Sequence, residues 1–314
     1  MPTVDGSYRV LVGALPEALH ATAERLPWRL GLTQSPDGGW GDFVGLHPNR
    51  DLPIYAAQAA DAGLVPTRSE LRRFLRAHHF GGFCWLLRDR IEDGQVDADP
   101  RLLELAEVFE ANWREALAQA MGDGTLAEAL CDRAAARWQR GTRAEQRLLA
   151  SGSVRAPIYA SVVREKLSWI GVPSQALLMM HGNARRVTAF LHAHDLFMLG
   201  LQAIDDVIDI KQDRALRGCD VPTALGCSPG ALIRVAPKLL ARASAAAADG
   251  GFGWFATWLD AFANATQSWR LAGDPVGDEL DAIGVAGEIE EAVSTTSDKL
   301  VRIPNPPHAA VAPA

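Results

Sequence analysis

The stretch LGLQAIDDVIDIKQD (199–213) places a row of carboxylates within a segment that is otherwise Leu, Ile and Val. An α-helix turns about 100° per residue, so aspartates four residues apart lie close together on one side of it. Like charges at this spacing repel and raise one another's pKa, so something positive must compensate them. The segment reads as an apolar helix with one narrow acidic stripe, made of Asp205, Asp206, Asp209 and Asp213, with Gln202 in the same arc.

The acidic stripe has two explanations. One is a solvent-exposed helix face, which a D-D-x-x-D pattern alone does not exclude. The apolar lead-in FMLGLQAI (197–204) favours the other, a helix buried on most sides whose carboxylates bind divalent cations. Magnesium takes oxygen ligands and typically bridges one or two carboxylates to substrate phosphates.

A second acidic segment, GGFCWLLRDRIEDGQ (81–95), is suited to face the first. Its Asp89, Glu92 and Asp93 follow an apolar lead-in at helical spacing and share one face. Helical bundles build metal sites in their cores from side chains on facing helices. The two segments together therefore predict a metal–diphosphate site between two helices.

The body of the chain reads as helical throughout. The long stretches 101–156 and 174–221 contain no proline, and no period-two alternation bounded by hairpin turns occurs. The pair Asp99-Pro100 predicts a helix start, and apolar residues at three- and four-residue spacing continue from it to Gly122. We predict an all-α fold in a single domain.

Both ends of the chain depart from this pattern. The first 65 residues are the least regular, and QSPDGGWGDFVGLHPNRDLP (34–53) reads as an ordered loop. IPNPPHAAVAPA (303–314) is expected to be a disordered tail, because Pro-rich sequence buries too little to offset the entropy of ordering. We therefore place the domain at residues 1–302, with an irregular N-terminal segment at 1–65.

Composition argues against several classes of protein. The chain has 314 residues, of which 48% are hydrophobic and 22% charged, as in a soluble globular protein. No run approaches the roughly 18 consecutive apolar residues of a membrane span, so we expect no stable membrane insertion. A formal net charge of -7 argues against a nucleic-acid partner. The four cysteines lack metal-type spacing and the N-terminus lacks a secretion signal, which together indicate the cytoplasm.

The two acidic segments resemble the two aspartate-rich motifs of the trans-isoprenyl diphosphate synthase and terpene synthase superfamily. The second motif there reads F-Q-x-x-D-D-x-x-D, and this chain has LQAIDDVID (201–209); the first reads D-D-x-x-D-G, and this chain has DRIEDG (89–94). The family pattern Y-x-x-x-I-x-x-K is similar to YASVVREK (159–166), and DVPTALG (220–226) resembles a segment that follows the second motif. The resemblance covers residues 75–230 and implies the isoprenoid synthase fold, a helical bundle around a central cavity.

Departures from the family pattern bear on the reaction. Arg90 replaces the second aspartate of the first motif, either as a diphosphate contact or as a partner that neutralises Asp93 or Glu92. The G-G-K-x-x-R-P and R-R-G segments, through which chain-elongating members bind isopentenyl diphosphate, are not recognisable, and QVDADPRLL (95–103) is acidic. The second motif also resembles the N/D-D-x-x-S/T-x-x-x-E pattern of terpene synthases, which gives Asp213 an implied role.

The resemblance implies a role for each side chain in the motifs. Mg²⁺ is the implied cofactor, and its implied ligands are Asp89, Asp93, Asp205, Asp209 and Asp213, of which the first three are also the implied catalytic residues. An allylic isoprenyl diphosphate is the implied substrate, bound through Lys166, Gln202, Asp206, Arg90 and Arg164. Aromatic residues near the motifs are either core or a lining that stabilises a cation: Phe80, Phe83, Trp85, Trp169 and Phe197. The resemblance also implies a homodimer.

Three functions are consistent with this sequence. The favoured one is a Mg²⁺-dependent, class I terpene cyclase that ionises an allylic isoprenyl diphosphate and cyclises the cation. The alternative is an isoprenyl diphosphate synthase or prenyltransferase, which elongates the chain or transfers it to another acceptor. The third is a non-catalytic partner subunit. The altered first motif keeps the third open, whereas Lys166 and the intact second motif count against it.

Overall fold

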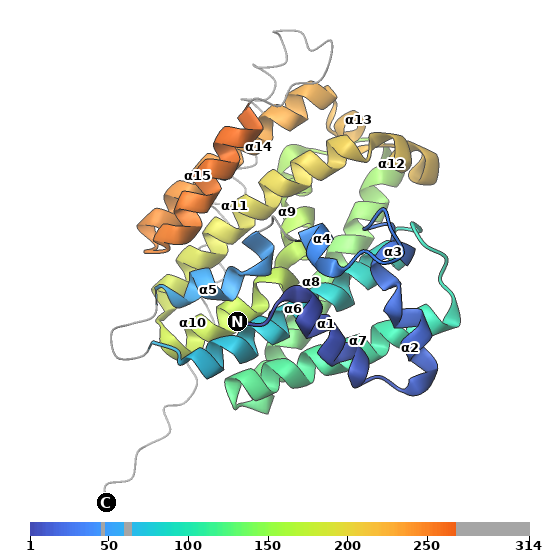
Figure 1. The fold of residues 1–314 in the computed structure, drawn as a ribbon. Coiled ribbons are helices and arrows are strands. Elements are labelled where there is room, and N and C mark those ends of the chain that lie inside the picture. Colours follow the sequence, from blue (N-terminus) through green and yellow to red (C-terminus); the bar gives the residue numbers. More distant parts are fainter. Residues whose placement is uncertain (45–47, 60–64, 268–314) are drawn as a thin grey trace, which may run out of the picture.

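A computed structural model describes residues 1–44, 48–59 and 65–267, and the regular secondary structure within these ranges is entirely helical (Figure 1). The predicted all-α fold is therefore confirmed. The expected tail at 303–314, together with 268–302 of the predicted domain, lies outside the described residues.

Long helices form the body of the molecule. They are α6 (Arg68–Glu92), α7 (Pro100–Met121), α8 (Gly124–Ser151), α9 (Ala156–Leu167), α11 (Ala184–Ile208), α14 (Pro229–Asp249) and α15 (Gly253–Gln267). The shorter η2 (Ser168–Gly171), α10 (Val172–His181), α12 (Ile210–Arg217) and α13 (Val221–Leu225) connect them. α6 packs along α7, α8 along α9, and α11 along α14, which also packs on α15.

Helix ends follow the local sequence signals. The Asp99 carboxylate accepts hydrogen bonds from the backbone N–H groups of Arg101 and Leu102 at 2.9 and 3.0 Å, which caps the start of α7. Gly122 ends the same helix with a φ of 67°, a left-handed conformation that costs glycine little. The predicted start and end of this helix are thus both confirmed.

The N-terminal segment is more regular than predicted. It contains α1 (Val4–Gly13), α2 (Glu17–Glu24), α3 (Leu26–Arg29), α4 (Trp40–Val44), η1 (Pro48–Arg50) and α5 (Leu52–Ala57). The prediction of a loop over 34–53 is therefore wrong for α4 and η1. α4 and η1 have five and three residues, which is too short for a hydrophobic period to show. α4 is held by the buried side chain of Trp40, which is 1% exposed.

The acidic stripe does not lie on one straight helix as predicted. α11 ends at Ile208, and α12 begins at Ile210, with Asp209 at the joint. The four-residue backbone bonds survive the joint, because Asp209 N donates to Asp205 O at 2.9 Å and Asp213 N donates to Asp209 O at 2.8 Å. The stripe therefore runs over two helices that meet at Asp209.

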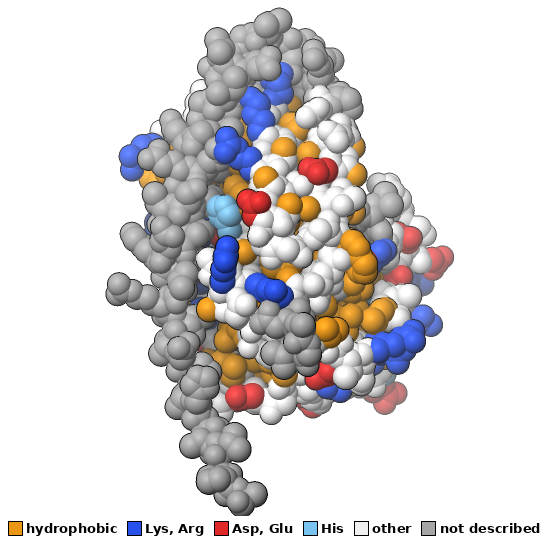
Figure 2. Space-filling model, turned by 90° about the vertical axis from the view of Figure 1, so that its left-hand side faces the viewer, with side chains coloured by type: hydrophobic (Ala, Val, Ile, Leu, Met, Phe, Trp, Pro, Cys, Tyr) orange, Lys and Arg blue, Asp and Glu red, His pale blue; other side chains and the backbone are white. Residues whose placement is uncertain are grey.

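By length and composition α11 could cross a membrane, but most of its apolar window is buried within the protein. A core helix of a helical bundle has the same properties. The surface in Figure 2 carries charged side chains of both signs among hydrophobic ones.

Candidate active site

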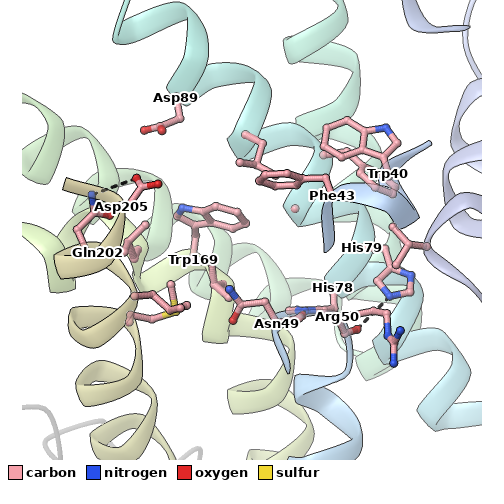
Figure 3. Close-up of a pocket in the computed structure, with 18 of the residues that line it drawn as sticks. Trp40, Phe43, Asn49, Arg50, His78, His79, Asp89, Trp169, Gln202 and Asp205 are labelled. Atoms are coloured by element: carbon pink, nitrogen blue, oxygen red, sulfur yellow. Dashed lines mark hydrogen bonds between the residues drawn. The ribbon is translucent and has the colours of Figure 1, made fainter. Parts of the chain in front are cut away.

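A cavity of about 490 Å³ lies among α6, α11, η2 and the N-terminal helices (Figure 3). Its wall is mainly apolar and aromatic, and comprises Val4, Trp40, Phe43, Gly82, Phe83, Leu86, Leu167, Trp169, Ile170, Met198, Leu201, Ile204, Ile208 and Phe262. Its polar lining residues are Asn49, Arg50, His78, His79, Asp89, Gln202 and Asp205. A cavity of this size and lining is suited to a small, largely apolar ligand.

α6 sets the length of the cavity. His79, Gly82, Leu86 and Asp89 line it and recur at three- and four-residue spacing, so they share one face of the helix. The interval from residue 79 to residue 89 spans about 15 Å at 1.5 Å per residue. Figure 3 shows Asp89 with Asp205 at one end of the cavity and His79 at the other.

The acidic end of the cavity joins the two motifs. Asp89 from α6 and Asp205 from α11 both line it, and Gln202 Nε2 lies 3.5 Å from Asp205 Oδ2. Burial raises the pKa of Asp205 to about 6, and the carboxylates of Asp209 and Asp89 add to the rise. The carboxylates of Asp205, Asp209 and Asp89 therefore repel one another, and a cation bound among them would relieve that repulsion.

Asp206 lies behind this end of the cavity and is buried. Its carboxylate accepts a hydrogen bond from Tyr159 Oη at 2.6 Å and another from Gln202 Nε2 at 2.8 Å. Burial raises its pKa to about 8 in spite of both bonds. Asp206 does not line the cavity, but it bonds to Gln202, which does.

Lys166 supplies the positive charge that the acidic segments require. Its Nζ lies 3.1 Å from Asp89 Oδ1, 3.1 Å from Asp93 Oδ2 and 2.7 Å from Glu145 Oε2. Burial lowers the pKa of Lys166, but the carboxylates of Asp89, Glu145 and Asp93 outweigh that effect and raise it well above its ordinary value. The ammonium group is therefore charged and held by three carboxylates.

A second cation reaches the first motif from α12. Arg217 Nη2 lies 2.7 Å from Asp93 Oδ2, and its Nη1 lies 3.7 Å from Asp213 Oδ1. Asp93 is thus paired with Lys166 and Arg217 instead of with Arg90. Arg90 is half-buried, and its charge lowers the pKa of Asp205.

The structure does not bring Arg164 to the cavity. Its Nε lies 2.7 Å from Asp195 Oδ2, and the two side chains are 4% and 8% exposed. Arg164 and Lys166 are two residues apart on α9 and so point about 200° apart, which prevents both from facing one ligand. The buried ion pair places Arg164 in the packing of α9 against α11.

The aromatic residues near the motifs divide into two groups. Phe83 and Trp169 line the cavity, whereas Phe80, Trp85 and Phe197 are buried and do not line it. Trp85 stacks on Trp169 with ring centroids 5.6 Å apart, and so supports the cavity wall from behind.

The donor set suits a magnesium ion that is bound together with a diphosphate. Within the described ranges, no three His, Cys, Asp or Glu side chains converge tightly enough to hold a metal by themselves. Magnesium needs only one or two carboxylates when phosphate oxygens complete its shell. Asp89 and Asp205 at the cavity end, with Asp209 close enough to raise the Asp205 pKa, meet that need. Asp93 and Asp213 do not line the cavity, and both are paired with Arg217.

Sequence reasoning missed two charged residues of this site. Glu145 comes from the last third of α8, where no motif marks it, so no sequence signal identifies it. Arg217 lies four residues after Asp213 on α12, and that spacing is a detectable sign of a helical ion pair.

Comparisons with known proteins identify the fold. No protein-family model matches the sequence, and no curated protein matches it. The chain is similar in structure to a polyprenyl synthetase from Streptomyces coelicolor A3(2), with a TM-score of 0.52 and 15% identity, over 94% of this chain and 95% of that one. It is similar to a decaprenyl diphosphate synthase from Rhodobacter capsulatus, with a TM-score of 0.52 and 14% identity, over 95% of this chain and 94% of that one. The chain therefore has the same all-helical fold as these two synthases.

Proposed function

We propose that the protein is a prenyltransferase that takes an allylic isoprenyl diphosphate. The observation that carries this proposal is an apolar cavity whose one end holds a carboxylate from each aspartate-rich motif, Asp89 and Asp205, next to Lys166. A ligand with an apolar tail and a polyanionic head matches a cavity with these properties. Similarity to a polyprenyl synthetase and a decaprenyl diphosphate synthase agrees with this class of enzyme.

Each part of the cavity then has a task in the reaction. Lys166 holds the carboxylates of Asp89, Asp93 and Glu145 in place and offsets part of their charge beside the end of the cavity where the diphosphate would bind. Asp89, Asp205 and Asp209 would hold Mg²⁺ against the diphosphate, where the ion supplies Lewis-acid stabilisation of the leaving group. The apolar wall excludes water, which protects the allylic group from hydrolysis while its bond to the diphosphate breaks.

A terpene cyclase is the second candidate, because one sequence feature favours it. The basic G-G-K-x-x-R-P and R-R-G segments that bind isopentenyl diphosphate are not recognisable in this chain. Arginine and lysine are the side chains that fix a second diphosphate. Without them the enzyme either transfers its prenyl group to a different acceptor or cyclises it.

Product analysis separates these candidates. The purified protein is incubated with Mg²⁺ and geranyl, farnesyl or geranylgeranyl diphosphate, with and without isopentenyl diphosphate. Longer diphosphates formed only in the mixture support a chain-elongating prenyltransferase. Hydrocarbon or alcohol formed from the allylic substrate alone supports the cyclase.

Binding provides the control for this experiment. If no product forms but an allylic diphosphate binds in the presence of Mg²⁺, the acceptor is another molecule. If none of the three allylic diphosphates binds with or without Mg²⁺, the proposed function is wrong, and the non-catalytic subunit becomes the better interpretation.

A further inference from the structure

Exposed arginines form a row along the outer side of α8. They are Arg133, Arg140, Arg143 and Arg147. Their spacings of three, four and seven residues place them within about 80° of one another around the helix, and the row spans about 21 Å at 1.5 Å per residue. The opposite side of α8, which includes Trp138 and Leu149, is buried in the core. The row therefore points away from the protein.

The acids of α8 and α9 do not cancel the charge of this row. Asp132 Oδ1 lies 2.7 Å from Arg114 Nη1 on α7, and Glu165 Oε1 on α9 lies 3.2 Å from Arg140 Nη2. Glu128 precedes the row and lies about 140° around the helix from its first arginine. The other three arginines of the row make no ion pair with any described residue. The row keeps at least three uncompensated positive charges.

α9 lies beside α8 and extends the basic surface. The two helices are joined by a short connection and are antiparallel, since Arg140 of α8 pairs with Glu165 of α9. Arg155, directly before α9, and Ile158, in its first turn, are both exposed, and Ile158 is 44% exposed. The antiparallel order places them next to the end of α8 that carries Arg147. We call the four arginines of the row, together with Arg155 and Ile158, the α8–α9 basic surface.

A protein partner or a second copy does not suit this surface. The centres of protein interfaces are depleted in charged residues and enriched in aromatic ones, whereas the aromatic residues of these two helices, Trp138 and Tyr159, are buried. A second copy docked about a two-fold axis through this surface would bring the same arginines together, and like charges repel. A nucleic acid would match the charge but would leave Ile158 without an apolar contact.

We propose that the α8–α9 basic surface docks on a lipid bilayer that contains anionic phospholipids. Guanidinium groups bind phosphate well, and each cation near an anionic membrane raises the affinity about fivefold. Ile158 is placed to enter the boundary between headgroups and acyl chains. This attraction falls off within about 10 Å, so the local surface decides it rather than the net charge of -7. Docking of this kind needs no membrane-spanning helix.

Co-sedimentation of the full chain with lipid vesicles tests the proposal. Vesicles of equimolar phosphatidylcholine and phosphatidylglycerol are compared with vesicles of phosphatidylcholine alone. The wild type is expected to bind the mixed vesicles on the order of 100-fold more tightly, and added salt should weaken that binding. The double variant Arg143→Gln/Arg147→Gln should bind the mixed vesicles about 25-fold less tightly than the wild type.

α6 offers a matched control, because Arg72 and Arg76 are exposed and have the same four-residue spacing. Arg72→Gln/Arg76→Gln removes the same charge and should leave the affinity for the mixed vesicles unchanged. Equal weakening by the two double variants would show that the net charge of the protein decides binding, and the proposal would be overturned. A wild type that binds both kinds of vesicle equally, or neither, also overturns it.

Two further measurements separate the bilayer from other occupants. Ile158→Ser should weaken binding to the mixed vesicles about tenfold and leave binding to heparin, a polyanion without acyl chains, unchanged. No effect on the vesicles would mean that the surface recognises polyanions in general. In sedimentation velocity, a dimer that Arg143→Gln/Arg147→Gln separates would assign the surface to a second copy and contradict the proposal. None of these measurements involves turnover, so failure of the proposed function leaves this inference standing.

Discussion

Asp205 and Asp206 are adjacent in the chain but belong to different parts of the site. One helical step of about 100° turns Asp205 toward the cavity and Asp206 toward Tyr159. Their pKa values differ accordingly, because burial raises that of Asp206 to about 8 and that of Asp205 to about 6. At neutral pH, therefore, Asp205 is the carboxylate available to a cation.

Asp205→Asn should lower activity on an allylic diphosphate by on the order of 100-fold, because it removes a charge aimed at the reacting end of the ligand. Its thermal unfolding temperature should be no lower than that of the wild type, because the change removes a buried charge whose pKa burial and like charges raise. Asp260→Asn, an exposed aspartate on α15, is the matched control and should keep full activity. Equal activities for the two variants in a steady-state assay would show that the acidic end is ordinary surface.

Lys166→Gln should lower the free energy of unfolding by about 3 kcal/mol, because it leaves Asp89, Asp93 and Glu145 close together without their shared cation. Added Mg²⁺ should restore part of the loss, since the freed carboxylates can bind it. Urea unfolding with and without Mg²⁺ measures both effects. Lys211→Gln, on the exposed face of α12, serves as the control. If Lys166→Gln is as stable as this control, the three ion pairs of Lys166 do not stabilise the protein.

At the scale of elements, the α8–α9 contact places Lys166. Gly141 on α8 lies so close to α9 that a Cβ built on it would be 2.6 Å from the Lys166 backbone nitrogen. The absence of a side chain there lets α9 approach α8, and so brings Lys166 Nζ within 2.7 Å of Glu145 Oε2. A glycine in mid-helix, which costs helix stability, is explained by this close packing.

Gly141→Ala should destabilise the protein by about 1–3 kcal/mol, because the two helix backbones must move apart. Gly124→Ala is the matched control in the same helix, since a Cβ there meets nothing within 4 Å. It should be neutral or slightly stabilising, given the higher helix propensity of alanine. Chemical denaturation measures the free energy of unfolding of both variants. Equal values would argue against the close contact between α8 and α9.

At the scale of the whole molecule, the N-terminal helices close the cavity by contacts to α6. Ser7 on α1 and the backbone of Asn49 and Arg50 in η1 all bond to His78 or His79. The cavity therefore depends on two buried histidines that join segments far apart in the sequence.

His78 and His79 should each lower the free energy of unfolding as the pH falls from about 6.5 toward 4. Burial lowers the pKa of His78 and His79 from 6.5 to about 4, so in this range the unfolded chain binds protons that the folded protein does not. Each histidine contributes a loss of about 2 kcal/mol at pH 5, and neither changes stability above pH 7. Asp206 and Asp205 act with the opposite sign and offset this loss, because their raised pKa values stabilise the folded protein as the pH falls below about 8 and 6, respectively.

A variant isolates the histidine contribution from that of Asp206. Between pH 7.5 and pH 5, the free energy of unfolding measured in urea should change about 2 kcal/mol more favourably for His79→Gln than for the wild type. His20→Gln, a histidine that does not line the cavity, should behave like the wild type. If the free energy of unfolding changes equally between the two pH values in all three proteins, His79 is not buried in its neutral form.

The sequence by itself determined the all-α fold, the helix from Asp99 to Gly122 and the two acidic segments. These features depend on local signals, namely caps, proline positions and a 3.6-residue period, which act within a few residues of chain. The same local reasoning failed for α4 and η1, because such short elements are fixed by distant contacts of residues such as Trp40.

Only the tertiary structure decided which charged residues meet. Helix spacing put Asp205 and Asp206 into one arc, but packing gave one to the cavity and the other to Tyr159. It also brought Glu145 from α8 to Lys166. Ion pairs between helices depend on which faces pack together, and no spacing within one helix encodes that. The sequence therefore determined the elements that carry the site, and the packing of those elements determined the site itself.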